Sequence, residues 1–218
     1  MTKTFALLLA ISCISIISYG QIKKGSILIG GQVSYYNSKI AHSTNQSDQK
    51  NSSAAFNISV GEAFKENSVF GLSLTYNPSS YDYTANSITY STSKLKFYSI
   101  GGYYRLYKKL AKDLYFFSEL GASYIFSKQT NTDTLGVKLS SVNSSGGQLS
   151  FMPGISYKIF KRVNLEITIP NIAYAQYSVS KNETFNPSQS SKEGRFYLNT
   201  SLNSSPLDYI GVGFRIIL

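Results

Sequence analysis

Residues that build metal centres and covalent cross-links are almost missing from this sequence. Its 218 residues include one cysteine, Cys13, one histidine, His42, and no tryptophan. A single cysteine forms no internal disulfide, and a lone histidine supplies too few ligands for a structural zinc site. We therefore expect neither a disulfide framework nor a metal site, and no motif in the sequence points to another cofactor.

Long apolar runs are also missing, with one exception at the N-terminus. Within residues 1–20, a basic residue precedes an apolar run from Phe5 to Ile17. Ser18 and Gly20 then give the small-x-small pattern that signal peptidase cleaves. The sequence predicts a signal peptide over residues 1–20 and a single domain over residues 21–218.

Two other interpretations of the leader stay open. A retained transmembrane helix would need about 20 apolar residues, and this run is shorter. A lipoprotein would carry its acyl chains on Cys13, but the preceding residues, Ala10-Ile11-Ser12, match that motif poorly. The signal peptide and the lipoprotein both predict that the protein is exported.

Acidic residues are scarce, with 11 Asp and Glu against 21 Lys and Arg and a net charge of +10. A basic balance suggests an anionic partner. The basic residues are scattered along the sequence, and an exported chain rarely meets nucleic acid, so we expect no nucleic-acid partner. Lipid phosphate and lipopolysaccharide are the more natural partners.

The C-terminal stretch from Tyr209 to Leu218 alternates strictly between two kinds of residue. One set is apolar throughout: Ile210, Val212, Phe214, Ile216 and Leu218. The other set contains two glycines and Arg215. A period of two is typical of a β-strand with two different faces.

The same alternation predicts seven further strands upstream. They cover Ser26–Tyr36, Ala54–Gly61, Phe70–Tyr76, Lys94–Tyr107, Leu114–Phe126, Gln148–Phe160 and Leu165–Ile169. The connections alternate between short turns and long polar loops, at Asn37–Ser53, Pro78–Ser93, Lys128–Gly147 and from Tyr177 to beyond Ser190. This pattern predicts an all-β fold, an eight-stranded antiparallel up-and-down β-barrel, with Phe196–Leu202 either in the last strand or in an extra segment.

The less apolar face of the predicted strands, which we call the minority face, decides whether such a barrel is soluble or transmembrane. It carries small polar residues and glycines together with five charged residues: Arg105, Glu119, Lys158, Glu166 and Arg215. A soluble lipocalin-like barrel would turn its apolar face inward, and these residues could not fill a dry core. We therefore expect the apolar face to meet lipid.

The five inward charges are expected to form an ion-pair network near the short turns. Arg105 and Glu119 face each other across one hairpin, and Lys158 would lie opposite Glu166 if the next turn has three residues. The network is either a structural plug or a gate and ligand site. An eight-stranded interior has little spare room, which favours the plug.

Two further residue sets have candidate roles. Outward tyrosines are expected to form a girdle at the membrane interface: Tyr35, Tyr76, Tyr98, Tyr104, Tyr124 and Tyr157. His42 beside Ser43 could serve a lipid A-modifying enzyme, but no third group is identified to orient the imidazole. We assign no catalytic residue.

The sequence resembles the small outer-membrane β-barrel family of the OmpA-barrel and OmpX-like kind, of the Bacteroidota type. The matching stretches are GLSLTY (71–76), FYSIGGYYRLY (97–107), LYFFSELGASY (114–124) and YIGVGFRIIL (209–218). The resemblance implies a bacterial outer-membrane location in the cell envelope. It also implies that Phe214, Ile216 and Leu218 form the signal read by the barrel assembly machinery. Many family members end in Phe, whereas this chain ends in Leu218.

Together these observations lead us to expect a monomeric, non-enzymatic barrel with a structural, surface-interaction or adhesion-type role and a plugged lumen. Three alternatives stay open: a narrow porin-like channel, a barrel that binds a small ligand or lipid, and a lipid A-modifying enzyme.

Overall fold

The computed structural model describes residues 22–40, 48–85, 88–169, 172–185, 187–200 and 210–218. The predicted signal peptide with Cys13, and His42, lie outside these residues. Within the described ranges, no helix has the length and apolar character to cross a membrane. Ten β-strands run through them: β1 Ile27–Ile40, β2 Asp48–Lys65, β3 Ser68–Ala85, β4 Ile88–Lys109, β5 Leu114–Asp133, β6 Lys138–Phe160, β7 Val163–Thr168, β8 Ala173–Phe185, β9 Ser188–Thr200 and β10 Gly211–Ile217.

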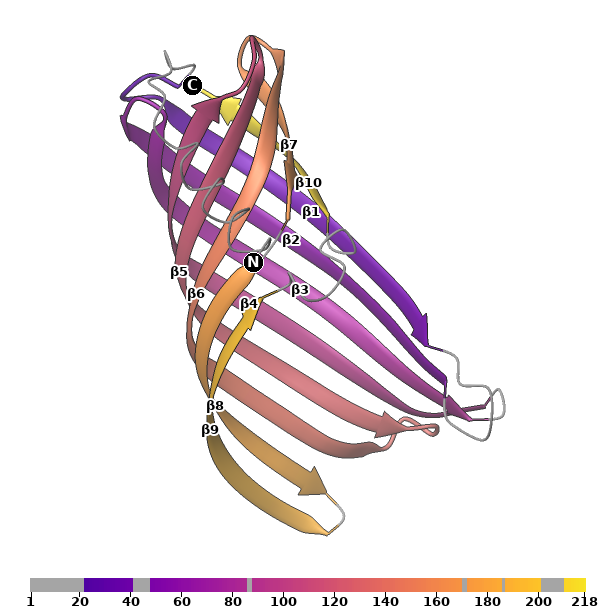
Figure 1. The fold of residues 1–218 in the computed structure, drawn as a ribbon. Helices are drawn as coiled ribbons and strands as arrows, with labels where there is room; N and C mark the ends of the chain where they lie inside the picture. Colours follow the sequence, from indigo (N-terminus) through magenta and orange to yellow (C-terminus); the bar gives the residue numbers. More distant parts are fainter. Residues whose placement is uncertain (1–21, 41–47, 86–87, 170–171, 186, 201–209) are drawn as a thin grey trace, which may run out of the picture.

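Eight of these strands close into a ring. Its order is β1-β2-β3-β4-β5-β6-β7-β10, and β10 returns to β1 (Figure 1). All pairings are antiparallel, and the closing seam runs from Leu28 opposite Ile217 to Ser34 opposite Gly211. The eight-stranded antiparallel transmembrane barrel expected from the sequence is confirmed.

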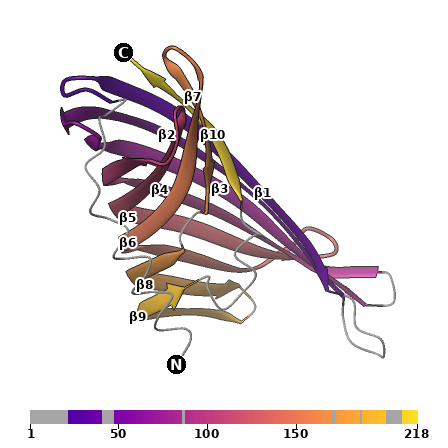
Figure 2. The same ribbon diagram turned by 45° about the horizontal axis from the view of Figure 1, so that its top comes forward.

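The remaining strands, β8 and β9, correct the prediction of a long last loop from Tyr177. The edge of β6 pairs with β7 over Gly154–Phe160 and with β8 over Ser140–Phe151, so β8 continues the line of β7. Strand β9 then pairs with β8 and extends the wall (Figure 2). Part of Phe196–Leu202 therefore belongs to an extra strand, and 201–209 lie outside the described residues.

Strands β1 to β6 are longer than the predicted ones, and most of the other long loops are also strand. Strand β4 has 22 residues and β6 has 23, whereas about 10 suffice to cross a membrane. The segments expected as loops, such as Pro78–Ser93, contain few apolar residues, but their backbones still pair in the ladder. The barrel wall thus continues well past its apolar zone at the long-loop end.

That apolar zone faces outward. On β3 the side chains of Phe70, Leu72 and Leu74 are 59%, 61% and 56% exposed, and neighbouring strands repeat the pattern. Exposed apolar side chains around a whole barrel require hydrocarbon as the surrounding medium. The interior therefore holds the polar residues, as the minority face predicted.

A row of aromatic residues borders this apolar zone on the long-loop side. Phe56, Tyr76, Tyr98 and Phe126 lie opposite one another in register across β2 to β5. The Tyr76 and Tyr98 rings stack with centroids 4.9 Å apart, and those of Tyr98 and Phe126 are 5.0 Å apart. We call these four residues the aromatic row.

Candidate functional site

The interior near the short turns holds a cluster of charged side chains. Arg105 on β4 lies directly opposite Glu119 on β5. The Nε of Arg105 donates to Oε2 of Glu119 at 2.7 Å, and its Nη2 lies 2.7 Å from the same oxygen. The hairpin therefore brings this pair together by register alone, as the sequence predicted.

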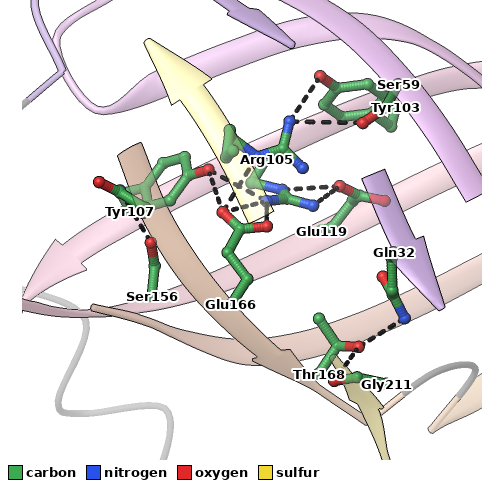
Figure 3. Close-up of polar contacts among 12 residues, drawn as sticks. Gln32, Ser59, Tyr103, Arg105, Tyr107, Glu119, Ser156, Glu166, Thr168 and Gly211 are labelled. Atoms are coloured by element: carbon green, nitrogen blue, oxygen red, sulfur yellow. Dashed lines mark hydrogen bonds and ion pairs between the residues drawn. The ribbon is translucent and has the colours of Figure 1, made fainter. Parts of the chain in front are cut away.

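Glu166 on β7 joins this pair to a second arginine (Figure 3). It accepts from Nη1 of Arg105 at 2.8 and 3.0 Å and from Nε of Arg215 at 3.0 Å. The hydroxyl of Tyr107 donates to Glu166 at 3.1 Å and accepts from Arg105 at 3.0 Å. Three strands that are distant in sequence thus meet at one carboxylate.

The cluster is balanced in charge and almost completely shielded. Its two arginines and two glutamates cancel, and Arg105, Glu166 and Arg215 are 2%, 4% and 3% exposed. The guanidinium carbon of Arg105 lies 4.2 Å from the centre of the Phe117 ring. In such surroundings each charge depends on its partners, because water cannot replace them.

Glycines on neighbouring strands make room for the large inward side chains. A Cβ on Gly30 would lie 2.9 Å from the guanidinium carbon of Arg215, its register partner. A Cβ on Gly154 would lie 2.3 Å from the Phe117 ring and 2.7 Å from the carbonyl oxygen of Ile167. The interior is thus filled by large residues packed over residues that lack a side chain.

Lys158 does not lie opposite Glu166 as the predicted network required. Glu166 lies opposite Ser156, and Lys158 lies opposite Asn164. The turn between Phe160 and Val163 has two residues instead of three, and the ladder shifts by one further position between Lys158 and Phe160. The salt bridges of Glu166 are those to Arg105 and Arg215. The pairing of Lys158 with Glu166 was therefore wrong.

Sequence reasoning missed the tyrosines of the cluster. Tyr107 shares the inward face of β4 with Arg105, and Tyr103 lies 3.5 Å from Nη1 of Arg215 through its hydroxyl. Both are buried, at 6% and 2% exposure. The signal was available, since both have the same odd-numbered parity as Arg105, whereas the outward tyrosines of β4 are even-numbered.

A polar cavity of about 440 Å³ lies next to the cluster on its long-loop side. Glu119 and Tyr103 belong to both. The remaining lining is mainly hydroxyl and amide side chains, including Gln32, Asn57, Thr75, Ser99, Gln148 and Ser150. Gln32 donates to Thr168 at 2.6 Å and Asn57 donates to Thr75 at 2.9 Å. In the part of the chain that the structure describes, no group of three or more His, Cys, Asp or Glu is placed to hold a metal.

Comparison with known proteins places the fold. No family model and no curated protein sequence matches the chain. The outer membrane protein OprG from Pseudomonas aeruginosa matches with a TM-score of 0.50 and 11% identity, over 92% of this chain and 99% of that one. This chain has the fold of the small outer-membrane β-barrels. At that identity the likeness concerns the fold alone.

Two further solved structures match the chain with lower TM-scores. Neisserial surface protein A matches with a TM-score of 0.39 and 16% identity, over 88% of this chain and 97% of that one. The outer membrane protease OmpT from Escherichia coli matches with a TM-score of 0.44 and 8% identity, over 94% and 99%.

The other predicted site residues lie on the outer wall. Of the six girdle tyrosines, Tyr35, Tyr98, Tyr124 and Tyr157 are exposed, and Tyr76 and Tyr104 are half-buried. Tyr76 and Tyr98 belong to the aromatic row, whereas Tyr104 and Tyr157 lie closer to the short turns. In the terminal segment, Phe214 and Leu218 are exposed on the outer face. Their roles as membrane girdle and assembly signal stay predictions.

Proposed function

We propose that this protein is a monomeric, non-enzymatic barrel of the bacterial outer membrane whose lumen is plugged and whose function is surface interaction. The observation that carries this proposal is the cluster around Glu166. Its side chains come from opposite walls of the ring and fill the short-turn half of the lumen. An interior this narrow, filled by paired and buried side chains, leaves no continuous path for ions.

Surface interaction is supported by what lies beyond the plug. Past the level of the aromatic row, β4 continues for 10 of its 22 residues, β5 for 7 of 20 and β6 for 7 of 23, so part of the wall projects outside the apolar zone. Loops and strand extensions on a rigid scaffold are a common place for recognition. Outer-membrane lipid, lipopolysaccharide and the barrel assembly machinery are the partners that we propose, and nucleic acid is not among them.

The test is conductance in a planar lipid bilayer. The chain from residue 21 onward, refolded in detergent and inserted, should give no stable ion-current steps. A double variant that removes both members of one pair, Arg105→Ser with Glu119→Ser, should open the lumen and give steps. Stable steps from the unaltered chain would overturn the plugged-lumen proposal.

A second candidate function rests on the 440 Å³ cavity, whose hydroxyl and amide lining suits a small polar solute. Saturation-transfer NMR with a set of monosaccharides and polyamines would test it. A specific signal that is lost on Gln148→Leu would support a ligand-binding barrel, and no signal from any of them would reject those ligand classes.

A further inference from the structure

The outer wall carries lysines directly beyond the aromatic row. One register row crosses β4, β5, β6, β8 and β9 and consists of Lys96, Lys128, Asn143, Lys181 and Lys192. It lies two residues along the strands from Tyr98 and Phe126, on the same outward face. Four of its five residues are lysines, all of them exposed.

This arrangement is unfavourable unless anions lie nearby. Lys96 is directly opposite Lys128, and Lys181 is directly opposite Lys192. Like charges in directly opposed positions of antiparallel strands repel and destabilise the sheet. A repeated arrangement of this kind therefore indicates an anionic partner that bridges the ammonium groups.

The protein neutralises only part of this charge itself. The ammonium of Lys181 lies 2.8 Å from Glu183. The hydrogen bond from Lys181 is the main reason that the pKa of Glu183 lies below its usual value, with smaller contributions from Lys138 and then Lys128. Among the salt bridges of the described residues, none includes Lys94, Lys96 or Lys128.

A hollow in the outer wall adjoins Lys96 of this row and Lys94, which lies two residues further along the same face of β4. It has a volume of about 330 Å³ and lies over β1 to β4, with Lys94 and Lys96 among its lining residues. Tyr35, Ala54 and Pro78 line it as well and give it an apolar side. A cation beside an apolar hollow, at the border of the lipid-facing zone, suits a molecule with a phosphate head and a hydrocarbon body.

We propose that Lys94, Lys96 and Lys128 bind the phosphate groups of an anionic glycolipid of the outer leaflet. The hydrocarbon next to those phosphates occupies the hollow beside Tyr35. We assign the anion to a lipid and not to a soluble molecule, because the aromatic row places these lysines at the level of the lipid head groups. The site rests on the proposed outer-membrane location.

The experiment measures the affinity of the refolded chain for lipid A in neutral detergent micelles, by microscale thermophoresis at two salt concentrations. The triple variant Lys94→Gln, Lys96→Gln, Lys128→Gln should bind bisphosphorylated lipid A about 100-fold more weakly, at roughly fivefold for each lysine. The triple Lys→Arg variant should retain binding. Lipid A without phosphates should not distinguish the unaltered chain from the Gln variant.

A matched control removes the same charge at the opposite end of the barrel. Lys108→Gln, Lys109→Gln, Lys112→Gln changes three lysines near a short turn and should leave affinity unchanged. Equal losses in both triple variants, or no loss in either, would overturn the site. Free pyrophosphate that binds as tightly as lipid A would overturn the assignment to a lipid.

This experiment can reject the lysine site without rejecting the proposed function. A mobility shift between boiled and unboiled samples on a gel shows whether each variant folds as a closed barrel. A chain that shifts but does not bind lipid A rejects only the lysine site. A chain that stays soluble and folded without detergent rejects the outer-membrane location itself.

Discussion

The two halves of the barrel share strands β1 to β6 but have different interiors. Near the short turns, the inward side chains are Arg105, Glu166 and Arg215 with buried aromatic rings, and water has almost no access. Towards the long loops, the inward faces of these strands and of β8 carry hydroxyls and amides, such as Ser144 and Ser180, whose oxygens are 2.7 Å apart. We infer that one alternating pattern builds both a dry half and a wet half, because the polar cavity lies in the second of them.

The difference teaches how a narrow transmembrane barrel can hold charge. In the dry half a charge is tolerable only when it is paired, so removal of one partner is costly. In the wet half a hydroxyl that loses its partner can turn to water, so its removal costs little. Equivalent substitutions in the two halves should differ widely in effect.

The largest effect is expected for Glu166→Ala. It leaves both Arg105 and Arg215 without their shared carboxylate and should lower the free energy of unfolding by about 3–5 kcal/mol. Urea unfolding in micelles, followed by the gel shift, measures this. The matched control is Glu183→Ala, which removes an exposed ion pair and should leave the midpoint unchanged. Equal shifts would contradict the claim that burial in the dry half makes the loss of Glu166 costly.

A smaller loss is expected for Glu119→Ala. Arg105 then keeps its bonds to Glu166 and Tyr107, and Glu119 is the member of the cluster that also borders the polar cavity. We expect a loss of about 1–3 kcal/mol, typical of a bond to a charged group. An unfolding midpoint equal to that of the unaltered chain would argue against the network as a source of stability.

Packing gives a third comparison. Gly154→Ala forces a Cβ against Phe117 and the backbone of β7, and overpacking typically costs about 1–3 kcal/mol. Gly147→Ala is the control on the same strand, where a Cβ would meet no atom within 4 Å. Thermal unfolding of the two variants should separate them, and identical melting temperatures would show that the dry half is not tightly packed.

The smallest effect is expected for Ser144→Ala. Its hydroxyl pairs with Ser180 in the wet half, and water can replace that partner. The urea midpoint should stay within the error of the unaltered chain. A shift as large as that of Glu119→Ala would mean that the long-loop interior is also dry.

The sequence predicted the parts of the fold that depend on alternation. The apolar faces around Leu72 and Val212 recur with a period of two, and pairing Arg105 with Glu119 needed only the length of one short turn. The error at Lys158 has a different origin, since a register shift beside a turn leaves no mark in composition. The shorter turn and the register shift together displaced the pairing by two positions, which placed Asn164, not Glu166, opposite Lys158.

The long strands were missed because their outer parts are polar on both faces. In β9, residues from Ser188 onward are exposed on both sides, so no apolar alternation distinguishes strand from loop. These residues form a strand because their backbone pairs with β8, and the local sequence does not show that pairing. The row of Lys96, Lys128, Lys181 and Lys192 could not be recognised in the sequence either, because its members are far apart in the chain and become neighbours only when the strands pair.

The contrast between a dry and a wet half is tested most directly by thiol labelling. Residues 21–218 contain no cysteine, so a single introduced thiol reports its own surroundings. We predict that Ser150→Cys, in the wall of the cavity, reacts rapidly with a small methanethiosulfonate reagent, whereas Ser156→Cys, fully buried beside the cluster, stays protected until the barrel unfolds. Equal labelling rates at the two positions in the folded barrel would contradict the account.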